Sequence, residues 1–174
     1  MKSVGLKYRV RDILPSFLAD AMLGDIARKL RILGYDTTYI KDTEDNYVLQ
    51  EALKEERIVL TRDRELFRRV IKNRIQGILL DEEDEIDNIA YALTKNRIYH
   101  VSFSTRTARC SLCNGILKEI PSPDARSQLP TNIARSHTRF FQCSKCIKFY
   151  WEGSHVSGLH MLARRVNDKI KKLQ

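Results

Sequence analysis

Four short apolar runs in the first hundred residues alternate with segments whose apolar residues recur at helical spacing. Strands that alternate with helices of this length predict βαβ crossovers, and therefore a parallel sheet covered by helices on both faces. An aspartate follows each run within three residues. The runs and their acids are 17–19 with Asp20, 38–40 with Asp42, 58–60 with Asp63, and 78–80 with Asp81. The carboxyl ends of parallel strands share one edge of the sheet, where open α/β sheets bind their ligands.

Acids that gather at one edge repel one another unless a cation neutralises them, and carboxylate oxygens suit Mg²⁺ or Mn²⁺. Taken alone, several of these acids are better explained as caps of the helices that follow them. Their recurrence favours a metal site, because capping does not require the acids to share one edge. The candidate ligands are Asp20, Asp45 and Asp63, with Asp81 as a fourth candidate and with Asp42 and Glu44 as alternatives to Asp45.

The net charge of +9 comes entirely from the second part of the chain. Residues 1–100 contain 18 basic and 18 acidic residues, whereas residues 101–174 contain 13 basic and 4 acidic residues. We therefore expect two units, 1–100 and 101–174. A neutral unit with clustered acids followed by a basic unit suits an enzyme that acts on a polyanion, although a solubilising surface charge produces the same pattern.

No apolar stretch approaches the length of a membrane span, and the first residues lack the layout of a secretory signal. We therefore expect a soluble, cytoplasmic protein without a membrane partner. The amphipathic segment 159–173 is expected to be a helix packed on the core. We also expect a strand at 98–103, an exposed loop at 120–137, and an additional edge strand within residues 1–14.

The four cysteines form two pairs, Cys110 with Cys113 and Cys143 with Cys146, each with two intervening residues. Two such pairs tens of residues apart present four thiolates for tetrahedral Zn²⁺, and an intracellular chain is not expected to use them as disulfides. A redox pair or plain core cysteines are the alternatives. A zinc ion with four thiolate ligands has no open position, so the predicted role of this metal is structural.

Basic and aromatic residues are interleaved around the cysteines, a composition that suits unpaired RNA. The predicted RNA-binding residues are Arg106, Arg109, Arg135, Arg139, Lys145 and Lys148. The aromatic residues Phe141, Phe149 and Trp151 either stack on bases or form the small core of this unit.

Several strings of residues in this chain resemble the Mut-seven C-terminal RNase domain family. The strings are 17–24, 30–37, 60–64, 109–114, 143–146 and 150–155. The resemblance covers roughly residues 16–155 and implies a PIN-like three-layer α/β nuclease domain fused to a zinc ribbon. It also implies that Asp20, Asp45 and Asp63 occupy the PIN-type acid positions, with Asp81 as a fourth candidate. The crowding of acids at 42–45 leaves the choice of the helix-borne acid open.

These observations predict a metal-dependent endoribonuclease that uses Mg²⁺ or Mn²⁺ and binds RNA with the help of its zinc ribbon. Arg31 and Arg62 lie near the acids, and each either pairs with a carboxylate or contacts the scissile phosphate. The alternative is a non-catalytic RNA- or ribosome-binding protein that keeps a nuclease-like fold. A toxin of the PIN kind is a third class. The sequence does not specify the RNA target or the oligomeric state.

Overall fold

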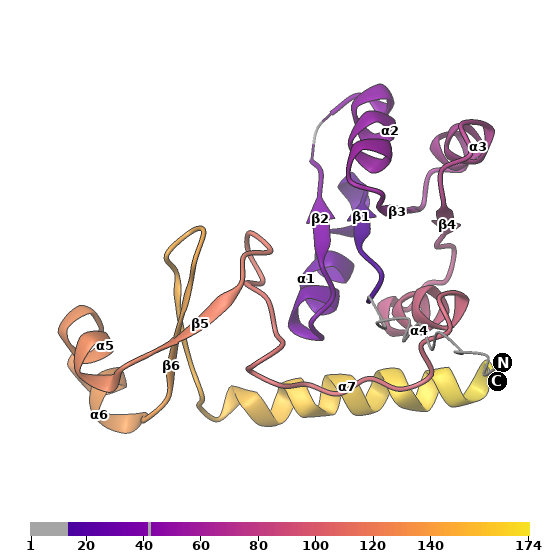
Figure 1. The fold of residues 1–174 in the computed structure, drawn as a ribbon. Helices are drawn as coiled ribbons and strands as arrows, with labels where there is room; N and C mark the ends of the chain where they lie inside the picture. The colour runs from indigo at the N-terminus through magenta and orange to yellow at the C-terminus, as the bar shows by residue number, and fades with distance from the viewer. Residues whose placement is uncertain (1–13, 42) are drawn as a thin grey trace, which may run out of the picture.

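A computed structural model describes residues 14–41 and 43–174 of the chain and contains a four-stranded parallel sheet (Figure 1). The strands are β1 (Phe17–Ala19), β2 (Thr37–Tyr39), β3 (Ile58–Thr61) and β4 (Gly77–Leu79), in the order β2-β1-β3-β4. All neighbouring strands pair in parallel, as the alternating pattern predicted. The edge strand expected within residues 1–14 lies almost wholly outside the described residues.

Helices cover both faces of this sheet, which makes three layers. They are α1 (Gly24–Ile32), α2 (Asp45–Lys54), α3 (Arg64–Lys72) and α4 (Glu85–Lys95), and a short 3-10 turn, η1 (Ala21–Leu23), precedes α1. Successive side chains of a strand point to opposite faces. Phe17 and Ala19 of β1 therefore join one core with residues of α1 and α4, while Leu18 joins a second core with residues of α2 and α3.

The expected helical stripes match these four helices, with three exceptions at their edges. In the sequence, Met22, Leu53 and Ile71 fall at the helical spacing of these stripes, but each residue is more than half exposed. Gly34 lies two residues beyond the end of α1, adopts a φ of +96° and donates its backbone N–H to the carbonyl of Arg31 at 3.0 Å. Glycine reaches this left-handed conformation without the steric cost that other residues carry.

The second part of the chain contains an antiparallel sheet and three helices. The strands are β5 (Leu117–Ile120), β6 (Phe140–Cys143) and β7 (Phe149–Trp151), in that order, and the helices are α5 (Ser122–Gln128), α6 (Thr131–Ser136) and α7 (His155–Lys172). The loop expected at 120–137 is therefore wrong, because two short helices form there. Pro121 and Pro130 precede these helices directly, and proline is well tolerated where a helix begins.

The strand expected at 98–103 is also wrong, because this segment pairs with a side chain instead of a strand. The backbone N–H of Val101 donates to Asn167 Oδ1 at 2.8 Å, and Asn167 Nδ2 donates back to the Val101 carbonyl at 2.8 Å. Val101 and Phe103 are buried, which explains the alternating apolar pattern. The exchange ties this segment to α7.

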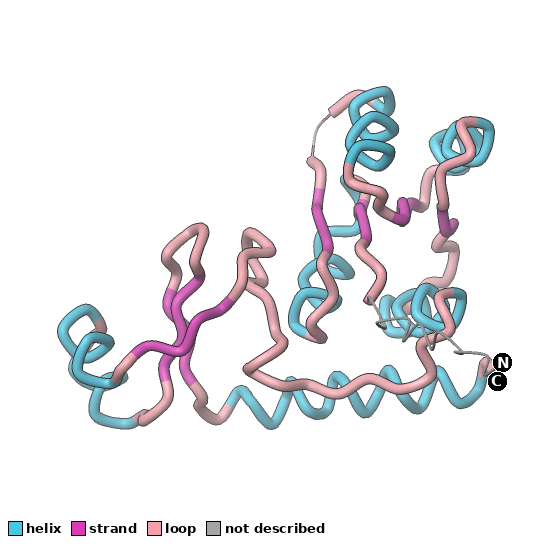
Figure 2. Tube along the Cα trace, viewed as in Figure 1, coloured by secondary structure: helices cyan, strands magenta, loops and turns pink. Residues whose placement is uncertain are grey.

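The long helix α7 runs beneath the sheet and reaches α4, as Figure 2 shows. Its residues Ala163, Val166 and Ile170 belong to the same buried core as α1 and α4, so the packed amphipathic helix predicted here is confirmed. A boundary after residue 100 stays a prediction, although α7 of the second part completes the core of the first. Within the described residues, no helix has both the length and the apolar character that a membrane span requires.

We expect Ile170→Ala to destabilise the protein by about 2–5 kcal/mol, because this fully buried side chain fills the contact between α7 and α4. Leu173→Ala is the control: Leu173 lies just after α7 and is 52% exposed, so its loss should change stability by about 0.5 kcal/mol or less. Urea unfolding of both variants measures the difference. Equal midpoints would show that α7 does not contribute to the core.

Candidate functional site

The carboxyl ends of β1 and β3 form the point where the strand order of the parallel sheet reverses. The chain passes from β1 through α1 to β2 on one side, and then returns through α2 to β3 on the other side of β1. Ligands of open α/β sheets bind in the crevice at such a reversal. Asp20 follows β1 directly, and Asp63 lies two residues beyond the end of β3.

A single hydroxyl group joins these two aspartates. Thr61, a fully buried residue at the end of β3, donates its Oγ1 hydrogen to Asp20 Oδ2 at 2.9 Å. The same Oγ1 accepts the backbone N–H of Asp63, also at 2.9 Å. Thr61 was not identified as a candidate from the sequence. The available signal was its place as the last residue of β3, directly before Arg62 and Asp63. The side chain of Asp20 and the backbone of Asp63 therefore bind the same hydroxyl group.

Both aspartates are also helix caps, as the alternative explanation required. Asp20 Oδ1 accepts the N–H of Ala21 at 2.7 Å, and Asp63 Oδ1 accepts the N–H groups of Glu65 and Leu66 at 2.7 and 3.1 Å. In the part of the chain that the structure describes, nothing donates to Asp63 Oδ2. The Asp63 side chain is exposed, so capping leaves one of its oxygens facing solvent.

Two of the remaining acid candidates, Asp45 and Asp81, contact arginines. Asp45 is the first residue of α2, and its Oδ2 accepts a hydrogen bond from Arg69 at 2.6 Å. Asp81 Oδ2 lies 3.8 Å from a guanidinium nitrogen of Arg64 in an exposed ion pair. Glu44 caps α2 through its backbone and is exposed, and Asp42 lies outside the described residues. Across residues 14–41 and 43–174, the only group of three or more His, Cys, Asp or Glu side chains close enough to share one ion is formed by the cysteines.

The two candidate arginines occupy different environments. Arg31 is 5% exposed, and it donates from Nε to the Thr37 carbonyl at 2.8 Å and from Nη1 to the carbonyls of Ser111 and Leu112 at 3.1 and 3.0 Å. Burial lowers the pKa of this guanidinium below its usual value. Arg62 donates from Nη2 to the Glu82 carbonyl at 3.3 Å. Neither arginine forms an ion pair with a carboxylate of the described residues.

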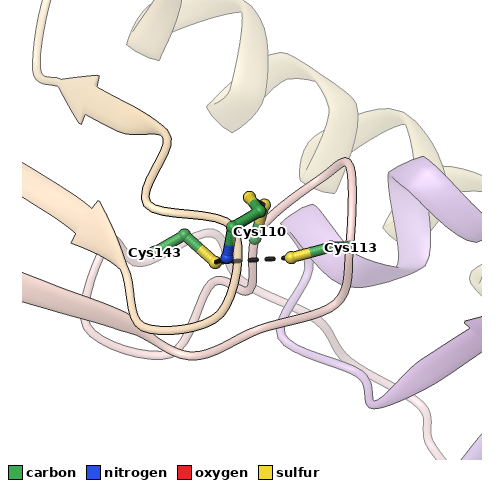
Figure 3. Close-up of side chains that lie close together, drawn as sticks. Cys110, Cys113 and Cys143 are labelled. Carbon is green, nitrogen blue, oxygen red and sulfur yellow. Dashed lines mark hydrogen bonds between the residues drawn. The ribbon is translucent and has the colours of Figure 1, made fainter.

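The four cysteine sulfur atoms lie within 4.8 Å of one another. Figure 3 shows the side chains of Cys110, Cys113 and Cys143 close together. The Sγ atoms of Cys113 and Cys143 are 3.4 Å apart, and those of Cys110 and Cys146 are 3.5 Å apart. A tetrahedral zinc site with bonds of about 2.3 Å separates its sulfurs by about 3.8 Å. The four cysteines are therefore close enough to bind one metal ion, and the donor set is consistent with structural zinc.

Backbone and hydroxyl hydrogen bonds surround these sulfurs. The N–H groups of Lys145 and Cys146 donate to Cys143 Sγ, each at 3.4 Å. Burial alone would raise the pKa of the Cys110 thiol. Hydrogen bonds from the Tyr150 hydroxyl, at 3.0 Å, and from backbone amides outweigh it and lower that pKa to about 6. A thiol that loses its proton readily is suited to hold a metal.

Asp36 connects the cysteine-bearing segment to the parallel sheet. Its carboxylate accepts from Arg57 at 2.6 Å and from Asn114 Nδ2 at 2.8 Å, and it pairs with Arg109 at 2.9 Å. Burial would raise the pKa of Asp36, but the hydrogen bonds from Asn114 and Arg57 and the charges of both arginines outweigh it, so the pKa lies below its ordinary value. This role of Asp36 has no local signal in the sequence, because its partners Arg57, Arg109 and Asn114 lie far along the chain.

The predicted RNA-binding residues divide into exposed and paired side chains. Arg106, Arg135, Lys145 and Lys148 are exposed. Arg109 pairs with Asp36, whereas Arg139 forms two hydrogen bonds of 3.0 Å with Glu119 and one of 2.9 Å with Glu152.

The aromatic residues divide in a similar way. Phe141 is buried, as expected for the core of the ribbon, whereas Phe149 and Trp151 are partly exposed, and Trp151 stacks on His137 with ring centroids 6.1 Å apart.

The model of one protein family, described as the Mut7-C RNAse domain, matches residues 15–163. The chain belongs to this family. The match spans the Asp20–Asp63 pair and all four cysteines, and it extends into α7. Membership in the Mut7-C RNAse domain family indicates a nuclease-like function related to RNA. Searches of curated proteins and of solved structures return no match to the chain.

We expect Gly115→Ala to weaken metal binding, because a Cβ atom at this position would lie 2.6 Å from Cys143 Sγ and 2.9 Å from Lys145 Cβ. Gly158→Ala in α7 is the control, since its Cβ would meet no atom within 4 Å. Competition between the protein and a chromophoric chelator for Zn²⁺ measures the affinities. We expect a loss of about tenfold or more for the first variant and none for the second. Equal affinities would contradict the tight packing at Gly115.

We expect Asp36→Asn to destabilise the protein at neutral pH by removing the charge that Arg57 and Arg109 face. A carboxylate with a lowered folded pKa stabilises the fold above its unfolded pKa, and this contribution disappears as the pH falls through the folded pKa. The difference in melting temperature between wild type and variant should therefore be present at pH 7 and shrink below about pH 4. A difference that does not depend on pH would contradict the assigned charge.

Proposed function

We propose that this protein is a metal-dependent endoribonuclease that hydrolyses phosphodiester bonds in RNA. The observation that carries the proposal is the Asp20–Thr61–Asp63 linkage at the crevice between β1 and β3. Family membership supports RNA as the substrate class. The β1–β3 crevice is also where an α/β sheet of this topology binds ligands. We further propose a PIN-like fold for the sheet and its four helices, and a cytoplasmic location.

The proposed catalytic ion is Mg²⁺ or Mn²⁺, held by Asp20 and Asp63. Mg²⁺ commonly binds one or two protein carboxylates and completes its coordination with waters and substrate phosphate oxygens, so two acids suffice. Asp63 Oδ2 has no donor among the described residues and is open to solvent, which fits a ligand role. Asp45 would have to give up its hydrogen bond to Arg69 to join them. When bound, the ion supplies a Lewis acid for the phosphate and acidifies a water molecule.

The residues of the chain prepare this site before RNA arrives. Thr61 fixes Asp20 in one orientation, and the first amides of α3 fix Asp63 through its other oxygen. Ligands held in place in this way need little rearrangement in the reaction. Arg62, which lies between Thr61 and Asp63, supplies positive charge for the scissile phosphate. Arg31 is buried against backbone carbonyls and supports the site by positioning its neighbours.

We propose Zn²⁺ as the metal of the four cysteines, with a structural role. Four thiolates leave no open position for a substrate, and the fold around them is small enough to depend on a metal. The exposed cations Arg106, Arg135, Lys145 and Lys148 of this ribbon would then contact RNA phosphates, so affinity should fall as salt rises.

The decisive experiment compares wild type with the double variant Asp20→Asn, Asp63→Asn. Asparagine is as good a helix cap as aspartate, so both helix starts are preserved while both charges are lost. We expect Mn²⁺-dependent cleavage of single-stranded RNA to fall by about a hundredfold or more, because the metal ligands are lost. RNA binding should persist, because the ribbon is unchanged.

Asp84→Asn provides the matched control. Asp84 caps α4 by accepting from the N–H groups of Ile86 and Asp87, in the same way that Asp63 caps α3, but it follows the edge strand β4 instead of β1 or β3. This variant should cleave like wild type. If wild type binds RNA but cuts none in Mg²⁺ or Mn²⁺, the protein is a non-catalytic RNA-binding module and the nuclease proposal is wrong.

A further inference from the structure

A cavity of about 460 Å³ is lined by residues that neighbour Asp20 and Asp63 in the sequence, although neither aspartate lines it. Its walls come from η1 and the start of α1, from the segments that follow β2 and β3, and from the turn between Cys110 and Cys113. Met22 follows Asp20 by two residues, and Arg62 directly precedes Asp63, so the cavity and the carboxylates share the same chain segments. The volume falls in the range of about 300–1,000 Å³ that is usual for small-molecule sites.

The charge of the walls favours an anion. Four basic and two acidic side chains line the cavity, and each acid already has a basic neighbour: Asp25 pairs with Arg28 at 3.4 Å, and Glu85 pairs with Lys29. Arg62 also lines the cavity, and its Nε is a buried nitrogen without a hydrogen-bond partner. It is the one such side-chain atom in the part of the chain that the structure describes. A buried donor without a partner is costly, and a phosphate oxygen would satisfy it.

Apolar and aromatic side chains line the same cavity. Met22 is 70% exposed and Leu112 is 56% exposed, although both are large apolar residues. Tyr39 donates its hydroxyl to the Ala21 carbonyl at 2.7 Å, which fixes its ring. Gly24 allows this arrangement, because a Cβ there would lie 3.3 Å from the Tyr39 ring. A fixed aromatic ring flanked by exposed apolar side chains is a surface on which a base can stack.

We propose that this cavity binds one unpaired nucleotide of the RNA strand, next to the phosphate that the Asp20–Asp63 pair attacks. Its phosphate contacts Arg28 and Arg62, and its base lies against Met22, Tyr39 and Leu112. The position of the nucleotide relative to the scissile bond rests on the proposed nuclease function. The binding of a nucleotide rests on the cavity alone.

The turn between Cys110 and Cys113 forms one wall of this nucleotide site. Ser111 and Leu112 lie in this turn, and the buried Arg31 donates to both of their carbonyls. A metal held by the four cysteines would order the turn that carries Leu112, and Arg31 fixes that turn against α1. The ribbon thus contributes directly to the nucleotide site, in addition to any RNA contacts made by its distant basic residues.

The experiment uses the full chain with Asp20→Asn and Asp63→Asn, so that RNA is not cut and no chelator is needed. Adenosine, cytidine, guanosine and uridine 5′-monophosphates are titrated separately while backbone amide signals are followed by NMR. We expect saturable shifts at Gly24, Tyr39 and Leu112. A short single-stranded RNA is then titrated by fluorescence anisotropy, which distinguishes a site for an RNA strand from a site for free nucleotides only.

Two matched pairs of variants test the walls. Arg28→Ala removes an exposed arginine that lines the cavity and pairs with an acid three residues earlier. Its control, Arg68→Ala, removes an arginine of α3 that also pairs with an acid three residues earlier but does not line the cavity. Leu112→Ala is matched by Ile116→Ala, which is 59% exposed and lies in the same ribbon but does not line the cavity. We expect the cavity variants to weaken RNA binding about tenfold, in line with the loss of a contact to a charged group or a base. The controls should bind unchanged.

The outcomes separate the inference from the proposed function. If nucleotides leave the three amide signals unchanged, or if the cavity variants bind RNA like their controls, the nucleotide site is wrong even if cleavage requires Asp20 and Asp63. If wild type cuts no RNA but the cavity binds nucleotides as expected, the nuclease proposal is wrong and the site stands. The inference would also be overturned if free nucleotides bind but the cavity variants do not change the affinity for RNA.

Discussion

The buried guanidinium of Arg31 is the interaction on which the arrangement of the two parts depends. A buried charge without partners costs several kcal/mol, so the side chain requires the carbonyls that it contacts. One of these belongs to Thr37 in β2, and two belong to Ser111 and Leu112 between the first cysteines. Asp36 reinforces the contact from the same edge by pairing with Arg109. The cysteine cluster and the parallel sheet are therefore positioned by the same few polar groups.

The sheet could be predicted because helices cover both of its faces, so its strands appear as short apolar runs between helical stripes, and the central strands β1 and β3 are fully buried. The secondary-structure predictions were wrong at segments where the local residue pattern has a cause other than the predicted element. Val101 and Phe103 alternate like strand residues, but the partner of Val101 is the side chain of Asn167 on α7, which no local pattern indicates. The segment 120–137 was expected to be a loop, whereas its Pro121 and Pro130 precede two short helices.

The candidate site could be predicted only in part. Asp20 and Asp63 were identifiable because each follows a strand, and the parallel topology brings those strand ends together. The pairing of Asp45 with Arg69 depends on how α2 packs beside α3, and this packing has no signature in the sequence. Thr61 was missed for a similar reason. In the sequence it is an ordinary strand threonine, and only the fold brings both aspartates within hydrogen-bonding distance of its hydroxyl. The cysteine cluster could be predicted from the spacing of the four cysteines alone.

The position of α7 has a consequence for how the chain folds during synthesis. The core face of α4 is covered by a helix that begins about sixty residues later, and ribosomes add roughly 5–20 residues per second. Ile89 and Leu93 are therefore synthesised several seconds before Val166 and Ile170 emerge to cover this core. During this interval the nascent chain exposes an apolar surface to which chaperones can bind and through which neighbouring chains can aggregate. Completion of the first core thus waits for the synthesis of α7.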